Sequence, residues 1–305
     1  MTEQQHTDES PLAASRLDPG TYHVCFEGIR PFALVDRPDT FRVSQAGLAL
    51  GNYLRDNLGP GELAGRILDV GTGSGAIAML IRELGASSIT ATDICGRAVA
   101  SARENEVANF DTPAIDYSCC DLFPKSDIDS KFDLVVFNPP GWREPPKDFT
   151  SGEVAISRQL HLDAMFNGHS VIQRFLQKLP ERLAAGGRAI VGFNSLVGIE
   201  DVLAAARTAL TQSTGARIHT QVLARVELPL MLYTSEWTHA LGALLSSFEH
   251  GRSEYAATYL QTNDTIHWFY EITEITFDHT GDGERIGAAS ALPAEQVVPQ
   301  QVTRS

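Results

Sequence analysis

The sequence predicts an α/β fold in which a mostly parallel, seven-stranded sheet carries helices on both faces. Three observations support this prediction. Short apolar runs alternate with amphipathic helical segments through the middle of the chain, as a parallel sheet requires. The run FDLVVFN, residues 132–138, is apolar almost throughout, which is typical of a strand covered on both faces. The run at residues 66–70 leads directly into a glycine-rich turn that opens a helix.

The individual elements follow from apolar periodicity and from glycine and proline punctuation. The seven predicted strands are residues 66–70, 88–93, 114–118, 132–138, 188–193, 217–228 and 266–277. The predicted helices are residues 76–84, 97–109, 171–185 and 199–210. Gly85 is expected to close the first helix as a left-handed cap, and the pair Gly186-Gly187 is expected to end the third.

The chain is expected to form one domain, residues 21–278, between two tails. Residues 1–20 are polar without an apolar period, and residues 279–305 are rich in Gly, Ala, Pro, Gln and Thr, so both are expected to be disordered. Residues 229–265 form a C-terminal insertion between the last two strands. The sequence leaves open whether this insertion faces the substrate.

Composition limits the partners and the compartment. The formal net charge of −14 argues against a large phosphate-binding surface, so nucleic acid is not expected as a substrate. The four cysteines include no CxxC spacing, which indicates neither a disulfide framework nor a metal site and makes a reducing cytoplasm the expected location. No apolar run reaches membrane-spanning length, and the polar start is unlike a signal peptide. The oligomeric state stays open.

Glycines recur after the first strand, at Gly71, Gly73 and Gly75. A strand that turns sharply into a helix needs residues without Cβ atoms, both for unusual dihedral angles and for close approach of a ligand. Ala76 stands where the dinucleotide fingerprint G-x-G-x-x-G would have its last glycine, which weighs against NAD. An NAD-dependent dehydrogenase nevertheless remains an alternative. Asp69, before the turn, can hold the loop amides or, through water, an ammonium group.

Two more aspartates follow the next strands. Asp93 ends the second strand, where a carboxylate can accept hydrogen bonds from both hydroxyls of a ribose. Asp121 follows the third strand and can accept from an adenine amine, with Leu122 and Phe123 beside the ring. Either aspartate alone is also compatible with a turn or a helix cap. Together with the glycine turn, they favour a ligand made of adenosine and an amino-acid tail.

The segment Asn138-Pro139-Pro140 follows the fourth strand. The prolines fix φ and remove two donors, so nearby carbonyl groups are left free to accept from a ligand. An acceptor NH₂ could donate to the Asn138 side-chain oxygen and to the Pro139 carbonyl. These bonds would orient the nitrogen lone pair at a methyl sulfonium and stabilise the positive charge that grows on nitrogen. A simple strand-ending turn is the alternative.

In this order the motifs resemble those of the class I S-adenosylmethionine-dependent methyltransferases. The resemblance is greatest to the NPP-motif branch, which contains the HemK-like protein-glutamine N5 methyltransferases of translation release factors. It covers about residues 32–210 and rests on VDRPDT, DVGTGSGAIA, ATDIC, CDLF and FDLVVFNPP, which begin at Val35, Asp69, Ala91, Cys120 and Phe132. The resemblance implies a Rossmann-like class I methyltransferase fold with S-adenosyl-L-methionine as cofactor.

The resemblance also assigns residues to the site. The cofactor would be held by Asp69, Gly71, Thr72, Gly73, Ser74, Gly75, Asp93, Ile94, Asp121, Leu122 and Asn138. The catalytic corner would be Asn138, Pro139 and Pro140, and the acceptor would also meet Gly141 and Trp142. No metal is implied.

The chain departs from the family pattern in two places. Where the family has Tyr or Phe after the two prolines, this chain has Gly141, so either Trp142 supplies the ring or the glycine makes room for a bulkier acceptor. About thirty residues precede the matching region, too few for the helical domain with which the glutamine enzymes dock their protein substrate.

The sequence therefore predicts a methyltransferase that acts on an amino or amide nitrogen of a small molecule or peptide. The alternatives are a protein-glutamine N5 methyltransferase and an O- or C-methyltransferase of specialised metabolism. A non-enzyme alternative is a binding module that kept the fold and lost catalysis.

Overall fold

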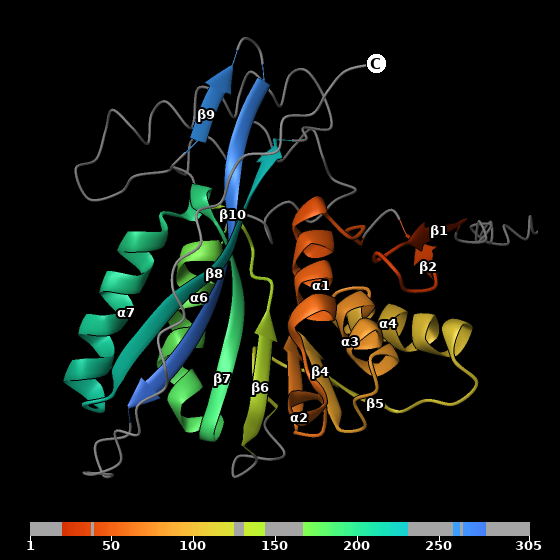
Figure 1. Ribbon diagram of the computed structural model, residues 1–305, viewed down its shortest axis with the longest axis horizontal. Coiled ribbons are helices and arrows are strands. Elements are labelled where there is room, and N and C mark those ends of the chain that lie inside the picture. The colour runs from red at the N-terminus through yellow and green to blue at the C-terminus, as the bar shows by residue number, and fades with distance from the viewer. Residues whose placement is uncertain are drawn as a thin grey trace, which may run out of the picture.

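The computed structural model describes residues 20–37, 40–124, 131–143, 167–230, 259–262 and 265–278. Most of the described strands belong to one sheet with the order β5-β4-β3-β6-β7-β10-β8, and β9 pairs with β10 off this path (Figure 1). Seven strands thus form the expected sheet, and β9 adds an eighth. The predicted tails lie outside the described residues, except that Gly20 begins β1.

The first five strands of this order are parallel. Their bounds are β5 (Ile115–Cys119), β4 (Ile89–Asp93), β3 (Ile67–Val70), β6 (Phe132–Phe137) and β7 (Leu183–Asn194). The connecting helices are α3 (Ala76–Glu83), α4 (Gly96–Asn109), α6 (Gly168–Lys178) and α7 (Ile199–Ser213). Gly85 follows α3 with φ +108°, which confirms the predicted cap.

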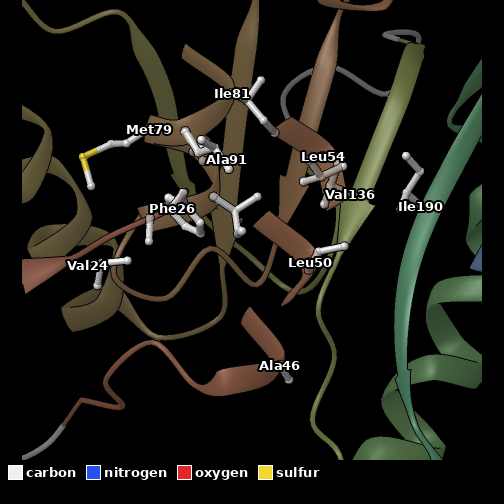
Figure 2. Close-up of a cluster of buried hydrophobic side chains, with 14 of the residues drawn as sticks. Val24, Phe26, Ala46, Leu50, Leu54, Met79, Ile81, Ala91, Val136 and Ile190 are labelled. Carbon is white, nitrogen blue, oxygen red and sulfur yellow. The ribbon is translucent and has the colours of Figure 1, made fainter. Parts of the chain in front are cut away.

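Both faces of the sheet are buried at its centre, in β3, β6 and the second half of β7. Alternate residues of β3, β6 and β7, among them Val136 and Ile190, join α1 (Gln45–Asn57), α3 and α4 in one apolar cluster, part of which appears in Figure 2. The intervening residues, such as Val135 and Val191, join α6 and α7 in a second cluster. Strands buried on both faces explain the uninterrupted apolar runs from which they were predicted.

The other end of the sheet is antiparallel. The strand β10 (Thr265–Asp278) lies between β7 and β8 (Arg217–Pro229) and runs antiparallel to both. The short strand β9 (Tyr259–Thr262) falls inside the predicted insertion and pairs with the start of β10. Residues 231–258 of that insertion lie outside the described residues.

The predicted helix at residues 171–185 is wrong at both ends. The helix α6 begins at Gly168 and ends at Lys178, and a short 3₁₀ turn, Leu179–Glu181, follows it. Pro180 lies in this turn because it has no N–H for a helical hydrogen bond. The strand β7 begins at Leu183, so Gly186-Gly187 does not end a helix but lies within β7, where its pairing with β6 is irregular.

Elements before residue 66 were not predicted. They are a hairpin of β1 (Gly20–Val24) and β2 (Phe32–Asp36), the helix α1 and a short helix α2 (Pro60–Leu63). The helix α4 holds the free edge of β2: Asn109 exchanges two hydrogen bonds of 2.8 Å with the backbone of Ala33, and Asn105 accepts from the amide of Val35 at 2.8 Å. The hairpin is thereby fixed beside the glycine turn.

Candidate active site

The predicted site residues gather at the carboxyl ends of the parallel strands, where ligands bind in open α/β sheets. Val70 at the end of β3 pairs with Thr92 of β4 on one side and with Phe137 of β6 on the other. The glycine turn and Asn138, which directly follow Val70 and Phe137, therefore leave the sheet from adjacent strands. The two motifs that carried the sequence prediction lie side by side.

The glycine turn needs its glycines for two different reasons. Gly71, Gly73 and Gly75 have φ values of +65°, +55° and +83°, a region that other residues rarely adopt. A Cβ atom on Gly75 would lie 3.0 Å from the Cβ of Ala102, so this glycine lets α4 pack closely on the turn. A Cβ atom on Gly73 would meet no atom within 4 Å, which leaves open space for a ligand there.

Hydrogen bonds from β4 and from α4 hold the turn. The amide of Thr72 donates to the Thr92 carbonyl at 2.8 Å. The side-chain amide of Asn105 donates to the carbonyl of Ser74 at 2.8 Å, and Asn105 is fully buried. Because the same side chain accepts from β2, Asn105 ties the N-terminal hairpin to the turn. Sequence reasoning missed it, since a helical asparagine carries no signal of this role.

Asp69 lies under the turn and is 3% exposed. Its Oδ2 accepts a hydrogen bond from the Thr72 hydroxyl at 2.6 Å. Burial raises the pKa of the Asp69 carboxyl to about 7, although hydrogen bonds from Thr72 and from the backbone of Ala78 act in the opposite direction. Asp69 thus holds the turn through the Thr72 hydroxyl, whereas its predicted contacts with the loop amides and with a ligand ammonium stay predictions.

Asp93 ends β4 beside the turn. Its Oδ2 accepts from the amide of Gly73 at 2.9 Å, and its Oδ1 accepts from the amide of Cys95 at 2.8 Å. Burial raises the pKa of the Asp93 carboxyl above its ordinary value, while these two amides act to lower it. The next residue, Ile94, is 70% exposed, so a large apolar side chain faces outward beside a partly buried carboxylate. The predicted contacts of Asp93 and Ile94 with the cofactor stay predictions.

The loop after β5 contains the third predicted aspartate. Asp121 forms an ion pair with Arg174 of α6, and both side chains are partly exposed. Leu122 has φ +68°, the only positive φ among the described residues other than glycine, and its carbonyl accepts from the Thr92 hydroxyl at 2.7 Å. Phe123 stacks on Phe175 with ring centroids 5.5 Å apart. Arg174 was not predicted, and an adenine amine would share Asp121 with it.

Asn138 is half-buried and has a partner that sequence reasoning missed. Its Oδ1 accepts a hydrogen bond from the hydroxyl of Tyr270, on β10, at 2.8 Å. Pro139 is buried and Pro140 is half-buried. No sequence signal relates Tyr270 to Asn138, because the two residues are 132 positions apart: Tyr270 lies on β10, Asn138 follows β6, and β7 lies between these strands.

The structure gives a reason for Gly141. A Cβ atom on this residue would lie 2.5 Å from Nδ2 of Asn194, at the end of β7. The Asn194 side chain is itself held, because its Oδ1 accepts from the amide of Leu196 at 2.8 Å. Trp142 is 3% exposed and belongs to the apolar cluster beneath α1. Contact of either residue with an acceptor stays a prediction.

The described ranges contain no group of three or more His, Cys, Asp and Glu residues that could hold a metal ion. Within the same ranges, no helix has the length and apolar character needed to cross a membrane.

This fold and this edge of the sheet define a methyltransferase domain of class I. Residues 44–151 are the part of the chain that matches the family described as methyltransferase small domain. It includes the glycine turn, Asp93, Asp121 and the Asn138-Pro139-Pro140 corner.

Among similar proteins are enzymes named for glutamine methylation. A release factor glutamine methyltransferase from Neisseria gonorrhoeae is 31% identical over 182 residues, which cover 58% of this chain and 62% of that protein. A putative protein N5-glutamine methyltransferase from Methanocaldococcus jannaschii is 31% identical over 139 residues, covering 45% of this chain and 66% of that protein. The chain thus matches less than two thirds of the length of these relatives.

A solved structure described as a putative SAM-dependent methyltransferase from Streptococcus mutans is also similar. It is 13% identical with a TM-score of 0.48, and the match covers 84% of this chain and 56% of that chain.

Proposed function

We propose that this chain transfers a methyl group from S-adenosyl-L-methionine to an amino or amide nitrogen of a small molecule or peptide. The observation that carries the proposal is the adjacency of the glycine turn and the Asn138-Pro139-Pro140 corner. Val70 and Phe137, which precede these two motifs, are paired residues of neighbouring strands. A ligand held on the turn would present its reactive end to the corner.

The residues around the turn fit the cofactor. Gly73 leaves open space at positive φ, where a bound nucleoside can approach the backbone. Asp93 keeps lone pairs on both oxygens for the ribose hydroxyls, and the exposed Ile94 offers an apolar surface for the adenine. The carboxyl groups of Asp69 and Asp93 lie at the turn, where acidic side chains suit a ligand that carries a sulfonium and an ammonium group.

The corner would hold the acceptor. The cofactor supplies an electrophilic methyl group on sulfur. The Asn138 oxygen and the Pro139 carbonyl would accept hydrogen bonds from the acceptor NH₂ and turn its lone pair toward that methyl group. The same oxygens would stabilise the positive charge that forms on nitrogen, and this step needs no strong general base.

Two related functions remain. The relatives named above favour methylation of a protein glutamine, the same chemistry on a side-chain amide. An O- or C-methyltransferase is the second, because Gly141 replaces the aromatic residue that the family has at this position.

The proposal is tested in two steps. Calorimetric titration with S-adenosyl-L-methionine should give saturable heat, whereas absence of heat would contradict cofactor binding. Methyl transfer from labelled cofactor should then be followed with small amines, small amides, peptides and a purified bacterial release factor. Mass spectrometry identifies the modified atom. Methylation of oxygen or carbon would contradict the assignment of nitrogen, and cofactor binding without transfer to any acceptor would favour the binding-module alternative.

A further inference from the structure

The contact between Tyr270 and Asn138 crosses a strand. Tyr270 lies on β10 and Asn138 directly follows β6, with β7 between the two strands. The phenol passes over β7 at Gly192: a Cβ atom on this glycine would lie 1.7 Å from the Tyr270 hydroxyl oxygen and 2.3 Å from its Cζ. Only a residue without a side chain leaves this passage open. Gly192 of β7 therefore makes room for the contact between Tyr270 on β10 and Asn138 after β6.

The direction of the hydrogen bond is set by the surroundings. Tyr270 is 1% exposed, and among the described residues its hydroxyl has one hydrogen-bond partner, the Asn138 side chain. A buried O–H group needs an acceptor, and the carboxamide offers one only through its oxygen. Burial also raises the pKa of the phenol, so it stays protonated at neutral pH. Tyr270 is thus a permanent donor.

The hydrogen bond from Tyr270 restricts rotation of the Asn138 carboxamide, because its oxygen has a permanent donor. If Asn138 rotated by 180°, its NH₂ group would face the phenol, and the Tyr270 proton would lose its acceptor. In the observed orientation the oxygen has one lone pair bound to Tyr270 and one lone pair left. The amide nitrogen points elsewhere: the Nδ2 atom lies 3.7 Å from the position of a Cβ atom on Gly47, in the first turn of α1.

We propose that Tyr270 is a positioning residue, which holds the Asn138 carboxamide with its oxygen available to the N–H of the methyl acceptor. It acts through Asn138 and touches neither cofactor nor acceptor. The inference rests on the proposed function in one respect only, namely that Asn138 receives the acceptor. The orientation of the carboxamide can be measured independently of any methyl transfer.

The kinetic test uses Tyr270→Phe, which removes the hydroxyl and keeps the ring. We expect kcat for the methyl acceptor, for example a purified release factor, to fall about tenfold, the effect of about 1.4 kcal/mol in the transition state. The Kd for S-adenosyl-L-methionine should stay within about twofold. The matched control is Tyr53→Phe on α1, which should change neither value. An unchanged kcat, or an equal loss of kcat and cofactor affinity, would overturn the inference.

A spectroscopic test does not need an acceptor. The side-chain amide signals of Asn138 can be assigned in ¹H–¹⁵N spectra by their absence in Asn138→Ala. In Tyr270→Phe these signals should shift and their hydrogen exchange should quicken, whereas Tyr53→Phe should leave them in place. Unchanged Asn138 signals in Tyr270→Phe would overturn the inference even if methyl transfer is observed. Altered signals in a protein that methylates nothing would support the positioning role and count against the proposed function.

Discussion

The carboxylate of Asp93 shapes the glycine turn directly, because its Oδ2 accepts from the amide of Gly73 at 2.9 Å. Its other oxygen binds the amide of Cys95 at the start of α4. One side chain thus fixes the relative position of the turn after β3 and the loop after β4. A ligand lying across both strands would meet a surface that is already arranged before it binds.

Replacing Asp93 with Ala should weaken cofactor binding before it affects turnover. The variant loses the proposed ribose contacts and the acceptor for the Gly73 amide, so we expect the Kd for S-adenosyl-L-methionine to rise about tenfold to a hundredfold. Calorimetric titration measures this change. Asp93→Asn is the matched control, because its remaining oxygen still accepts one hydrogen bond. Its Kd for S-adenosyl-L-methionine should lie between those of the wild-type protein and Asp93→Ala. An unchanged Kd in Asp93→Ala would contradict the ribose assignment.

Replacing Asn138 with Ala should have the opposite pattern. Its proposed bonds form to the acceptor, so we expect kcat to fall about a hundredfold or more while the Kd for the cofactor stays nearly unchanged. The variant also leaves the Tyr270 hydroxyl buried without its partner, which should lower the free energy of unfolding by about 1–3 kcal/mol. Steady-state kinetics and urea denaturation separate the two effects. Equal losses of turnover and cofactor affinity would mean that Asn138 is structural.

The stability of the fold should depend on pH through Asp69. The pKa of this carboxyl is about 7 in the folded protein and 3.8 in its ordinary state. Between these values the folded chain holds a proton that the unfolded chain has lost, so the free energy of unfolding falls as pH rises. The stabilisation that comes from the protonated Asp69 carboxyl is complete below about pH 4 and lost above about pH 7.

The comparison that isolates this effect is Asp69→Asn, which keeps an acceptor for Thr72 but does not titrate. Between pH 4.5 and pH 8, the wild-type protein should lose stability relative to Asp69→Asn, on the order of a few kcal/mol, because the other titrating groups are common to both. Urea denaturation across the pH series measures the difference. Parallel curves for the two proteins would show that Asp69 does not titrate in this window.

Gly141 and Asn194 should be energetically coupled. In Gly141→Ala the new Cβ atom would meet the Asn194 side chain at 2.5 Å, and we expect a loss of about 1–3 kcal/mol. Asn194→Gly should cost only a few tenths of a kcal/mol as a change of helix cap. In the double variant the clash is absent. Its loss of unfolding free energy should therefore be smaller than the sum of the two single losses by at least about 0.5 kcal/mol. Additive losses in urea denaturation would contradict the steric explanation for Gly141.

The sequence was sufficient for the parts of the fold that are buried on both faces or marked by special residues. The apolar run of β6 and the three glycines after β3 identify a parallel sheet and a ligand-binding turn, since each pattern has few other physical causes. The N-terminal hairpin was not predicted because β2 depends on hydrogen bonds from Asn105 and Asn109 of α4, about 70 residues later. Such long-range partners leave no local pattern.

In the site too, residues marked by a local sequence pattern could be predicted and long-range partners could not. Asp69 and Asp93 lie at the ends of apolar strands, Asn138 directly follows one, and the strand order brings all three to one edge of the sheet. Tyr270 and Arg174 contact two of the predicted residues but come from elements whose neighbours in space cannot be read from spacing. The apolar periodicity continues past Pro180, but α6 ends at Lys178, because a proline has no N–H with which to continue the helix.

The boundaries of the matched segment, residues 44–151, do not coincide with a unit that could fold by itself. It contains β3 to β6 but lacks β7, the other partner of β6, and it lacks Phe175, whose ring lies 4.6 Å from that of Phe137. A recombinant fragment with these limits would expose a bare strand edge and one apolar face of the sheet to water, and should therefore self-associate. We therefore expect ligand-binding experiments to need a polypeptide that also includes α6 and β7.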